Sequence, residues 1–167
     1  MQEIIQTKRE GEETPTEVRE LMHVMLTGDT YTGLRAIKAI GDIGAPAVGP
    51  LMQALTAVDD DARWTVAMAL ARIGNGAMEP LIEIIRTAED GITNPAVWAL
   101  GEIGDPGVVD PLVTVLQDSH RSECCRCLTA AALLKLGDPA GIARVREAFD
   151  LSGEEFAGIA MEAYEGP

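Results

Sequence analysis

The sequence predicts an all-α protein, a right-handed α–α superhelix of four helical hairpins with a capping helix at each end. An apolar residue followed by glycine recurs at spacings of 30, 30 and 33 residues, in Ile43-Gly44, Ile73-Gly74, Ile103-Gly104 and Leu136-Gly137. A helical apolar pattern precedes each pair, and a turn and a second apolar stretch follow it. Hydrophobic residues make up 47% of the 167 residues but aromatic residues only 4%, which favours close-packed helices.

The first helix of each hairpin is expected to end at the repeated glycine. Counted back from the glycine, positions minus one, minus four, minus seven and minus eight are apolar or small in nearly every copy. These positions share one face of a helix. Glycine after the last helical residue accepts a positive φ and so ends the helix. The first helices are expected near residues 31–43, 61–73, 94–103 and 122–136.

The second helix of each hairpin is expected to start just after a turn residue two positions beyond the glycine. Proline occupies that position in three copies, and proline suits the first turn of a helix. The second helices are expected near residues 47–56, 77–87, 107–117 and 139–149. The four repeats then span about residues 31–56, 60–87, 93–117 and 121–150.

The two ends of the chain differ from the repeats. Residues 1–13 are rich in charge, and we expect them to form a disordered acidic tail. A capping box at Thr14-Pro15-Thr16-Glu17 predicts a capping helix over about 15–27, and a second box at Ser152-Gly153-Glu154-Glu155 predicts another over about 152–164. Residues 14–167 are therefore expected to form a single domain.

Charge and cysteine content exclude several classes of function. Thirteen Lys and Arg against 27 Asp and Glu give a net charge of −14, which argues against nucleic acid as a partner. No run approaches the ~18 apolar residues of a membrane span, and the N-terminus lacks the apolar core of a signal peptide. The three cysteines are too closely spaced for a disulfide framework. We expect a soluble, cytoplasmic protein that binds neither nucleic acid nor membrane.

The pattern Ala-Leu-x-x-Ile-Gly, followed by a second helix that opens with Pro-Leu, recurs at a spacing of about 30 residues and resembles the HEAT-like repeats of the phycobilisome-lyase type. Four copies cover residues 31–150. The resemblance implies stacked polar contacts between neighbouring repeats, made by an arginine eleven residues before the glycine and an aspartate just after it. The matching residues are Arg63, Arg126, Asp105 and Asp138. The copies that depart from the pattern have Gly33, Thr93, Ala45 and Asn75 there.

Two functions follow from these observations. The leading one is a non-catalytic protein–protein interaction or scaffolding module, whose second helices present a curved, acidic surface to a partner protein with a basic surface. The side chains expected to line that surface are Gln53, Glu79, Glu83, Asp110, Thr114 and Arg146. No catalytic residue and no cofactor are expected in this role. The alternative, implied by the resemblance, is a bilin lyase-like enzyme subunit or a tetrapyrrole-binding chaperone, to which Arg63, Trp64, Trp98 and Arg126 could contribute.

Trp64 and Trp98 lie ten and six residues before their glycines, on the same flank of the first helix. Tryptophan is enriched in binding hot spots, so both are candidate contacts for a partner. A tryptophan can equally fill the gap that alanine-rich neighbours leave between repeats, and we favour that interpretation.

Three cysteines form the most distinctive local motif. His120, Cys124 and Cys127 fall at i, i+4 and i+7 of a helix, a spacing that could hold a soft metal ion, but no further ligand pair is visible and no metal is expected. The neighbouring arginines and the helix N-terminus would lower a thiol pKa, so Cys124, Cys125 and Cys127 are candidate reactive thiols. Helix packing is the favoured role, since cysteine is often buried.

Overall fold

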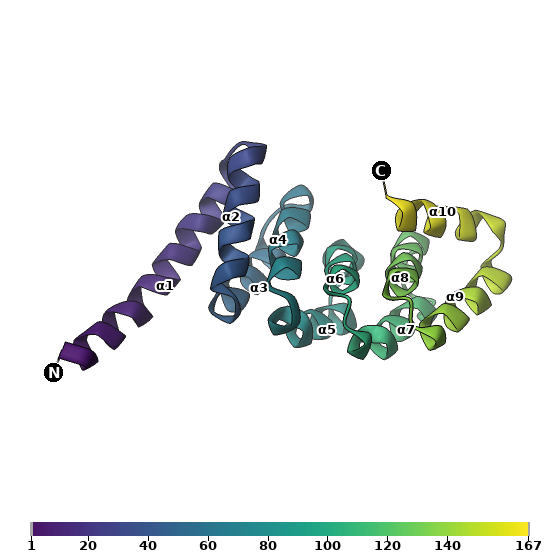
Figure 1. The fold of residues 1–167 in the computed structure, drawn as a ribbon. Helices are drawn as coiled ribbons and strands as arrows, with labels where there is room; N and C mark the ends of the chain where they lie inside the picture. The colour runs from purple at the N-terminus through teal and green to yellow at the C-terminus, as the bar shows by residue number, and fades with distance from the viewer. Residues whose placement is uncertain (1, 167) are drawn as a thin grey trace. The chain divides into compact units, whose positions relative to one another are not determined.

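We analysed a computed structural model, which describes the backbone of residues 2–166 and the side chains of residues 15–166. All regular secondary structure in the described backbone is helical, and helical hairpins repeat along the chain, which confirms the predicted all-α repeat fold (Figure 1). The chain divides into two compact units, Met1–Ala77 and Met78–Pro167. None of the described helices is both long and apolar enough to cross a membrane.

The first unit is built around a central helix that packs against helices on two sides. Helix α2 contacts α1 and α4, and α3 packs beneath α4. The elements are α1 (Gln2–Thr27), α2 (Thr30–Ile43), η1 (Ala45–Ala47), α3 (Val48–Ala57), α4 (Asp60–Ile73) and η2 (Gly74–Ala77). The fully buried core includes Val18, Ile40, Leu51, Leu55, Val66 and Leu70.

Helix α1 begins much earlier than its capping box predicts. It runs from Gln2 to Thr27 with Pro15 in its interior, so the segment expected to be a disordered tail forms its first turns. The Thr14-Pro15-Thr16-Glu17 box therefore does not start the helix. Residues 2–13 are rich in Gln, Glu, Lys and Arg, which have high helix propensity, and a proline removes only one backbone hydrogen bond from a continuing helix.

The second unit contains two layers of helices. Helix α8 packs between α6 and α10 in one layer, and α7 lies between α5 and α9 in the other (Figure 1). The elements are α5 (Met78–Thr87), α6 (Asp90–Ile103), η3 (Pro106–Val108), α7 (Val109–Gln117), α8 (Glu123–Leu136), α9 (Pro139–Ser152) and α10 (Glu154–Glu165). Its fully buried core includes Leu81, Ile85, Leu100, Leu112, Leu133 and Phe156.

The repeated glycines end the first helices as predicted. Their φ angles are 74°, 79°, 75° and 70° at Gly44, Gly74, Gly104 and Gly137, a region that favours glycine. Another glycine, Gly101, sits where α6 crosses α8, and a Cβ there would lie only 3.1 Å from the Cβ of Ala132. Small residues therefore set the close approach of these two helices.

Two helix boundaries in the second unit differ from the prediction. Helix α6 starts at Asp90 rather than near 94, because Pro95 lies inside the helix instead of in its first turn. Helix α9 continues through Ser152, and Gly153, with a φ of 87°, separates it from α10. The predicted capping box at Ser152 is therefore wrong, since Gly153 is the N-cap and provides no side-chain hydrogen bond.

Arg121 joins the loop before α8 to the loop before α6. Its side chain is only 12% exposed. It donates hydrogen bonds of 2.7–3.1 Å to the carbonyl oxygens of Ile85 and Ala88, to Thr93 Oγ1 and to Asp90 Oδ1. The backbone N–H of Ser122 donates to Asp90 Oδ2 at 2.8 Å. Burial raises the pKa of Asp90, but the hydrogen bonds from Ser122 and Arg121 outweigh burial and bring that pKa below its ordinary value of 3.8.

Of the two arginines that the resemblance singles out, Arg126 makes a polar contact with the preceding repeat, whereas the ion pair of Arg63 stays within its own helix. Arg126 donates from Nε to the carbonyl oxygen of Leu116 at 2.9 Å, and its guanidinium carbon lies 5.2 Å from the ring centroid of Phe156. Arg63 forms an ion pair with Asp60 in the first turn of its own helix. In the second unit, Arg121, an inter-repeat loop residue outside the family pattern, therefore adds to the contacts that Arg126 and Lys135 make with the preceding repeat.

The matching aspartates act as caps. Asp105 Oδ1 accepts a hydrogen bond from the backbone N–H of Gly107 at 2.8 Å. Asp138 Oδ1 accepts from the N–H groups of Ala140 at 2.9 Å and Gly141 at 3.2 Å. Both residues therefore hold the turn that starts the second helix of their own repeat.

Candidate functional site

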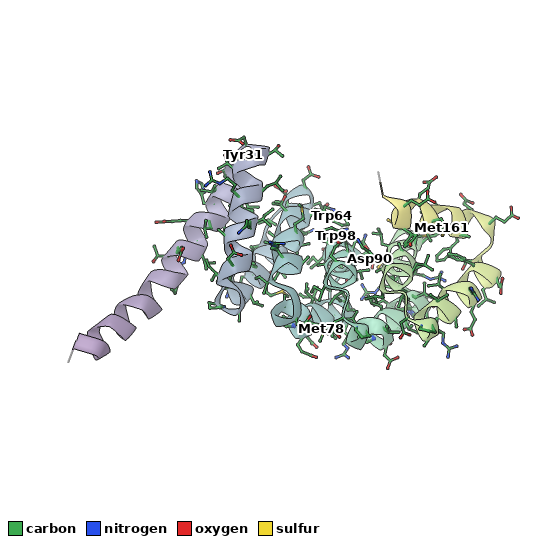
Figure 2. The ribbon with its side chains drawn as sticks, viewed as in Figure 1. Tyr31, Trp64, Met78, Asp90, Trp98 and Met161 are labelled. Carbon is green, nitrogen blue, oxygen red and sulfur yellow. The ribbon has the colours of Figure 1, made fainter. Side chains whose placement is uncertain are left out.

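Four large apolar side chains of the first unit are exposed on neighbouring helices. Tyr31 and Leu34 on α2 are 71% and 51% exposed, and Trp64 and Met68 on α4 are 38% and 37% exposed. We call these four residues the apolar cluster; Figure 2 labels Tyr31 and Trp64 of the four. Apolar side chains gathered on a surface typically mark an interaction site, and Trp and Tyr are enriched in binding hot spots.

Helical spacing explains why the apolar cluster faces water. Tyr31 and Leu34 are three residues apart and Trp64 and Met68 four apart, so each pair shares a side of its helix. Leu34 and Trp64 lie ten residues before the repeat glycine, and Met68 lies six before it, off the stripe that enters the core. Of the four, only Trp64 is predicted from the sequence as a contact for a partner. Tyr31, Leu34 and Met68 could have been predicted as exposed because each is a large apolar residue outside the stripe that enters the core.

A hollow of about 330 Å³ opens beside the apolar cluster. Leu34 and Met68 belong to both features. The lining residues are Met25, Leu26, Gly28, Asp29, Thr30, Gly33, Leu34, Ile37, Thr65 and Met68. They come from the end of α1, the α1–α2 loop, α2 and α4. The hollow is large enough for one or two partner side chains, since small-molecule pockets start at about 300 Å³.

Carboxylates lie at the N-terminal ends of the two helices that carry the apolar cluster. Asp29 caps α2: its Oδ2 accepts from the Thr32 hydroxyl at 2.7 Å, and its Oδ1 accepts from the Thr32 N–H at 3.0 Å. These hydrogen bonds lower the pKa of Asp29, so it is ionised at neutral pH. Asp61, in the first turn of α4, is exposed. The guanidinium carbon of Arg35 lies 5.9 Å from the Tyr31 ring centroid.

The polar residues predicted on the second helices all have exposed side chains. Gln53 is on α3 of the first unit. The others are in one helical layer of the second unit: Glu79 and Glu83 on α5, Asp110 and Thr114 on α7, and Arg146 on α9. Thr114 Oγ1 donates to the Asp110 carbonyl oxygen at 3.0 Å. The hollows of the described residues that involve Trp98, Leu34 and Leu21 lie elsewhere, on the first helices of the repeats and the terminal helices.

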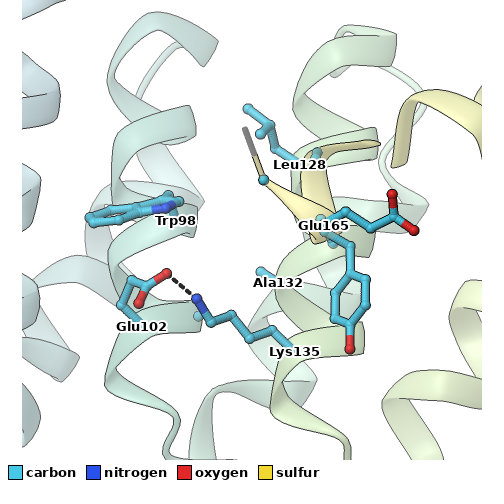
Figure 3. Close-up of a pocket in the computed structure, with 11 residues that line it drawn as sticks. Trp98, Glu102, Leu128, Ala132, Lys135 and Glu165 are labelled. Carbon is cyan, nitrogen blue, oxygen red and sulfur yellow. Dashed lines mark hydrogen bonds and ion pairs between the residues drawn. The ribbon is translucent and has the colours of Figure 1, made fainter. Parts of the chain in front are cut away.

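Trp98 lines a hollow of about 280 Å³ in the second unit (Figure 3). It is half-buried and lines the hollow together with the small residues Gly101, Ala131 and Ala132. The ammonium group of Lys135 on α8 pairs with the carboxylate of Glu102 on α6 at the edge of this hollow. Trp98 therefore lines a hollow between consecutive repeats, whereas Trp64 is exposed enough to contact a partner.

Two of the three candidate thiols are buried. Burial raises the pKa of Cys125 to about 12 and that of Cys127 to about 11, more than the nearby arginines lower them. The expected lowering of the pKa is therefore wrong for these two residues. Cys127 Sγ lies 3.6 Å from the Phe156 carbonyl oxygen, a packing contact with α10. Cys124 is exposed.

His120 is also exposed, and its ring Nδ1 lies 3.1 Å from Asp118 Oδ1. Since Cys127 is buried against α10, the i, i+4, i+7 spacing does not bring His120, Cys124 and Cys127 together as ligands. Among the described side chains, no group of three or more His, Cys, Asp or Glu is placed to hold a metal ion.

We expect only Cys124 to react with iodoacetamide when the folded protein is treated near neutral pH. Cys125 and Cys127 are shielded and have almost no thiolate at that pH. Peptide mapping by mass spectrometry should find carbamidomethylation at Cys124 alone, and at all three residues after denaturation. Rapid labelling of Cys125 or Cys127 in the folded state would contradict this assignment.

Comparisons with known proteins agree with the repeat architecture. A family model described as HEAT repeats matches residues 18–94 and 78–164. No curated protein matches the chain. Among solved structures, a designed armadillo repeat protein in complex with the peptide (KR)4 is 20% identical, with a TM-score of 0.48; the alignment covers 86% of this chain and 79% of that one.

Proposed function

The chain belongs to the HEAT repeat family, and from that premise we propose that it is a non-catalytic protein–protein interaction or scaffolding module. The observation that carries the proposal is the apolar cluster of Tyr31, Leu34, Trp64 and Met68 beside a hollow of about 330 Å³. Exposing such side chains to water is unfavourable, and covering them with a partner would bury them. HEAT repeats typically act as protein-interaction modules, which supports the same function.

Charge supports a partner with a basic surface. The chain carries a net charge of −14, and Glu79, Glu83 and Asp110 are exposed on the second helices of the second unit. An acidic surface speeds the approach of a basic protein and disfavours acidic partners. The carboxylates thus favour the encounter, while the apolar cluster provides most of the affinity.

The bilin-lyase alternative has weaker support. The guanidinium groups of Arg63 and Arg126, which would have to hold the propionates of a tetrapyrrole, are engaged with Asp60 and with Leu116 and Phe156. We retain the phycobilisome-lyase type as the repeat subtype, on its Ala-Leu-x-x-Ile-Gly pattern, without an enzymatic role. The three unpaired cysteines favour a cytoplasmic, reducing location.

Affinity capture from native lysate tests the proposal. We expect the wild-type chain to retain a partner in stoichiometric amount, and Trp64→Ala or Leu34→Ala to reduce its recovery to about a tenth or less, because truncating a hot-spot side chain costs about 2 kcal/mol or more. Quantitative mass spectrometry of the captured proteins measures the recovery. Both side chains are exposed, so we expect these variants to fold normally, which circular dichroism can check.

Leu151→Ala is the matched control. Leu151 is 88% exposed but belongs to α9 of the second unit and is not part of the apolar cluster. Its replacement should leave recovery unchanged. If the control and the cluster variants lose the partner equally, or if none of them loses it, the apolar cluster is not the interaction surface.

A further inference from the structure

The helices that carry the apolar cluster restrict how a partner can be recognised. All regular structure in the described backbone is helical, so the surface offers no strand edge with free N–H and C=O groups. The surface must therefore recognise a partner through the partner's side chains and not through its backbone groups. A helix is the fitting occupant, since its own backbone groups are already hydrogen-bonded and its apolar stripe can enter a groove between helices.

We use the name groove for the hollow of about 330 Å³ together with the apolar cluster beside it. The groove has the length of a contact with a short helix. On α2, Leu34 and Ile37 line the hollow and Tyr31 lies one turn before Leu34, so these apolar residues span six residue steps, or about 9 Å of helix axis, which is just under two turns. Met68 faces it from α4, and Leu26 closes the end at α1. A partner helix that places two or three apolar residues at i, i+3 or i+4 spacing would match this length.

Charge distinguishes one end of the groove. Asp29 lines the hollow, and Asp61 precedes Thr65 and Met68 by four and seven residues, which puts it on the same side of α4. The cations nearby are already engaged: Arg63 pairs with Asp60, and Arg35 stacks on Tyr31. The end of the groove formed by the N-termini of α2 and α4 is therefore acidic.

We propose that the apolar cluster binds a basic amphipathic helix of a partner protein. The apolar stripe of that helix fills the hollow beside Leu34 and Met68, and a lysine or arginine on its flank faces Asp29 and Asp61. This inference rests on the proposed interaction function and specifies the partner's chemistry. Neither the charge nor the apolar surface alone selects such a segment, whereas the two together do.

Two synthetic peptides of about 18 residues, roughly five helical turns, test the proposal. Both carry the same apolar stripe, flanked by lysine in one and by glutamate in the other. With the full-length protein, fluorescence anisotropy of the labelled lysine peptide should show saturable binding that weakens with added salt. The glutamate peptide should bind at least about tenfold more weakly. No binding of the lysine peptide, or equal binding of both, overturns the proposal.

Variants separate this site from general attraction to an acidic protein. Asp61→Lys should lower the affinity for the lysine peptide about tenfold, and so should Trp64→Ala. Glu155→Lys is the matched control, because Glu155 is also the second residue of its helix and makes the same change in net charge. An equal effect of Asp61→Lys and Glu155→Lys means non-specific attraction and overturns the proposal.

Failure of this inference can be told apart from failure of the proposed function. If lysate capture depends on Trp64 and Leu34 but is insensitive to salt and to Asp61→Lys, the interaction function stands and the partner is not a basic helix. If capture is independent of the apolar cluster, the proposed function itself fails.

Discussion

Replacing Arg121 with alanine is expected to lower the free energy of unfolding by about 3–5 kcal/mol. The change leaves Asp90 without its cation and strips hydrogen-bond donors from the carbonyl oxygens of Ile85 and Ala88, in a region where Arg121 is only 12% exposed. Urea unfolding followed by far-ultraviolet circular dichroism measures the loss. Arg144→Ala is the control, since the half-exposed ion pair of Arg144 with Glu147 should be worth less than about 1 kcal/mol. Similar losses in both variants would refute the assignment.

The contact between Arg121 and Asp90 also makes the free energy of unfolding depend on pH in the acid range. Because the pKa of folded Asp90 is below its ordinary value of 3.8, the unfolded chain takes up a proton first as the pH falls. The stabilisation from Asp90 is therefore fully present above about pH 5, and it is lost as the pH falls through the lowered pKa of the folded protein. Asp90→Asn should flatten the acid dependence of unfolding and leave Ser122 with a hydrogen-bond acceptor.

Phe156→Ala is expected to cost about 3–5 kcal/mol, the usual range for emptying a buried phenylalanine site. Phe156 is fully buried, its ring lies 6.0 Å from that of Phe149 in an edge-to-face arrangement, and the guanidinium group of Arg126 lies above it. It is the main anchor of α10. Hydrogen exchange should show α10 losing protection first, because it contributes this single large side chain to the core.

Ile159→Ala is the comparison for Phe156→Ala. Ile159 is on the same helix but exposed, so its truncation should cost less than about 1 kcal/mol. If Phe156→Ala left the protection of α10 unchanged, the helix would have to be held by its other contacts with α8.

Much of the fold could be predicted from the sequence, because helix ends are determined locally. The glycines at 44, 74, 104 and 137 have the positive φ that their spacing predicts, and the hairpins follow from them. The errors arise where local signals compete. Proline usually occupies the first turn of a helix, but Pro95 lies inside α6. Ser152 resembles an N-cap residue, although Gly153 takes that position.

The candidate site was less accessible to sequence analysis. A stripe of apolar residues predicts which helix face is buried, but not which apolar residues outside the stripe remain uncovered, so Tyr31, Leu34 and Met68 were missed. The pKa values of Cys125 and Cys127 were misjudged for a related reason. The arginines near them are visible in the sequence, whereas the burial that outweighs the arginines depends on the packing of α8 and α10.

The placement of the two tryptophans gives each compact unit one tryptophan fluorophore. Trp64 belongs to the first unit and Trp98 to the second, and the chain has no other tryptophan. The exposed Trp64 should emit at longer wavelength than the half-buried Trp98. Emission from single-tryptophan variants therefore provides separate optical reporters for the two halves, one of which also carries the proposed partner-binding groove.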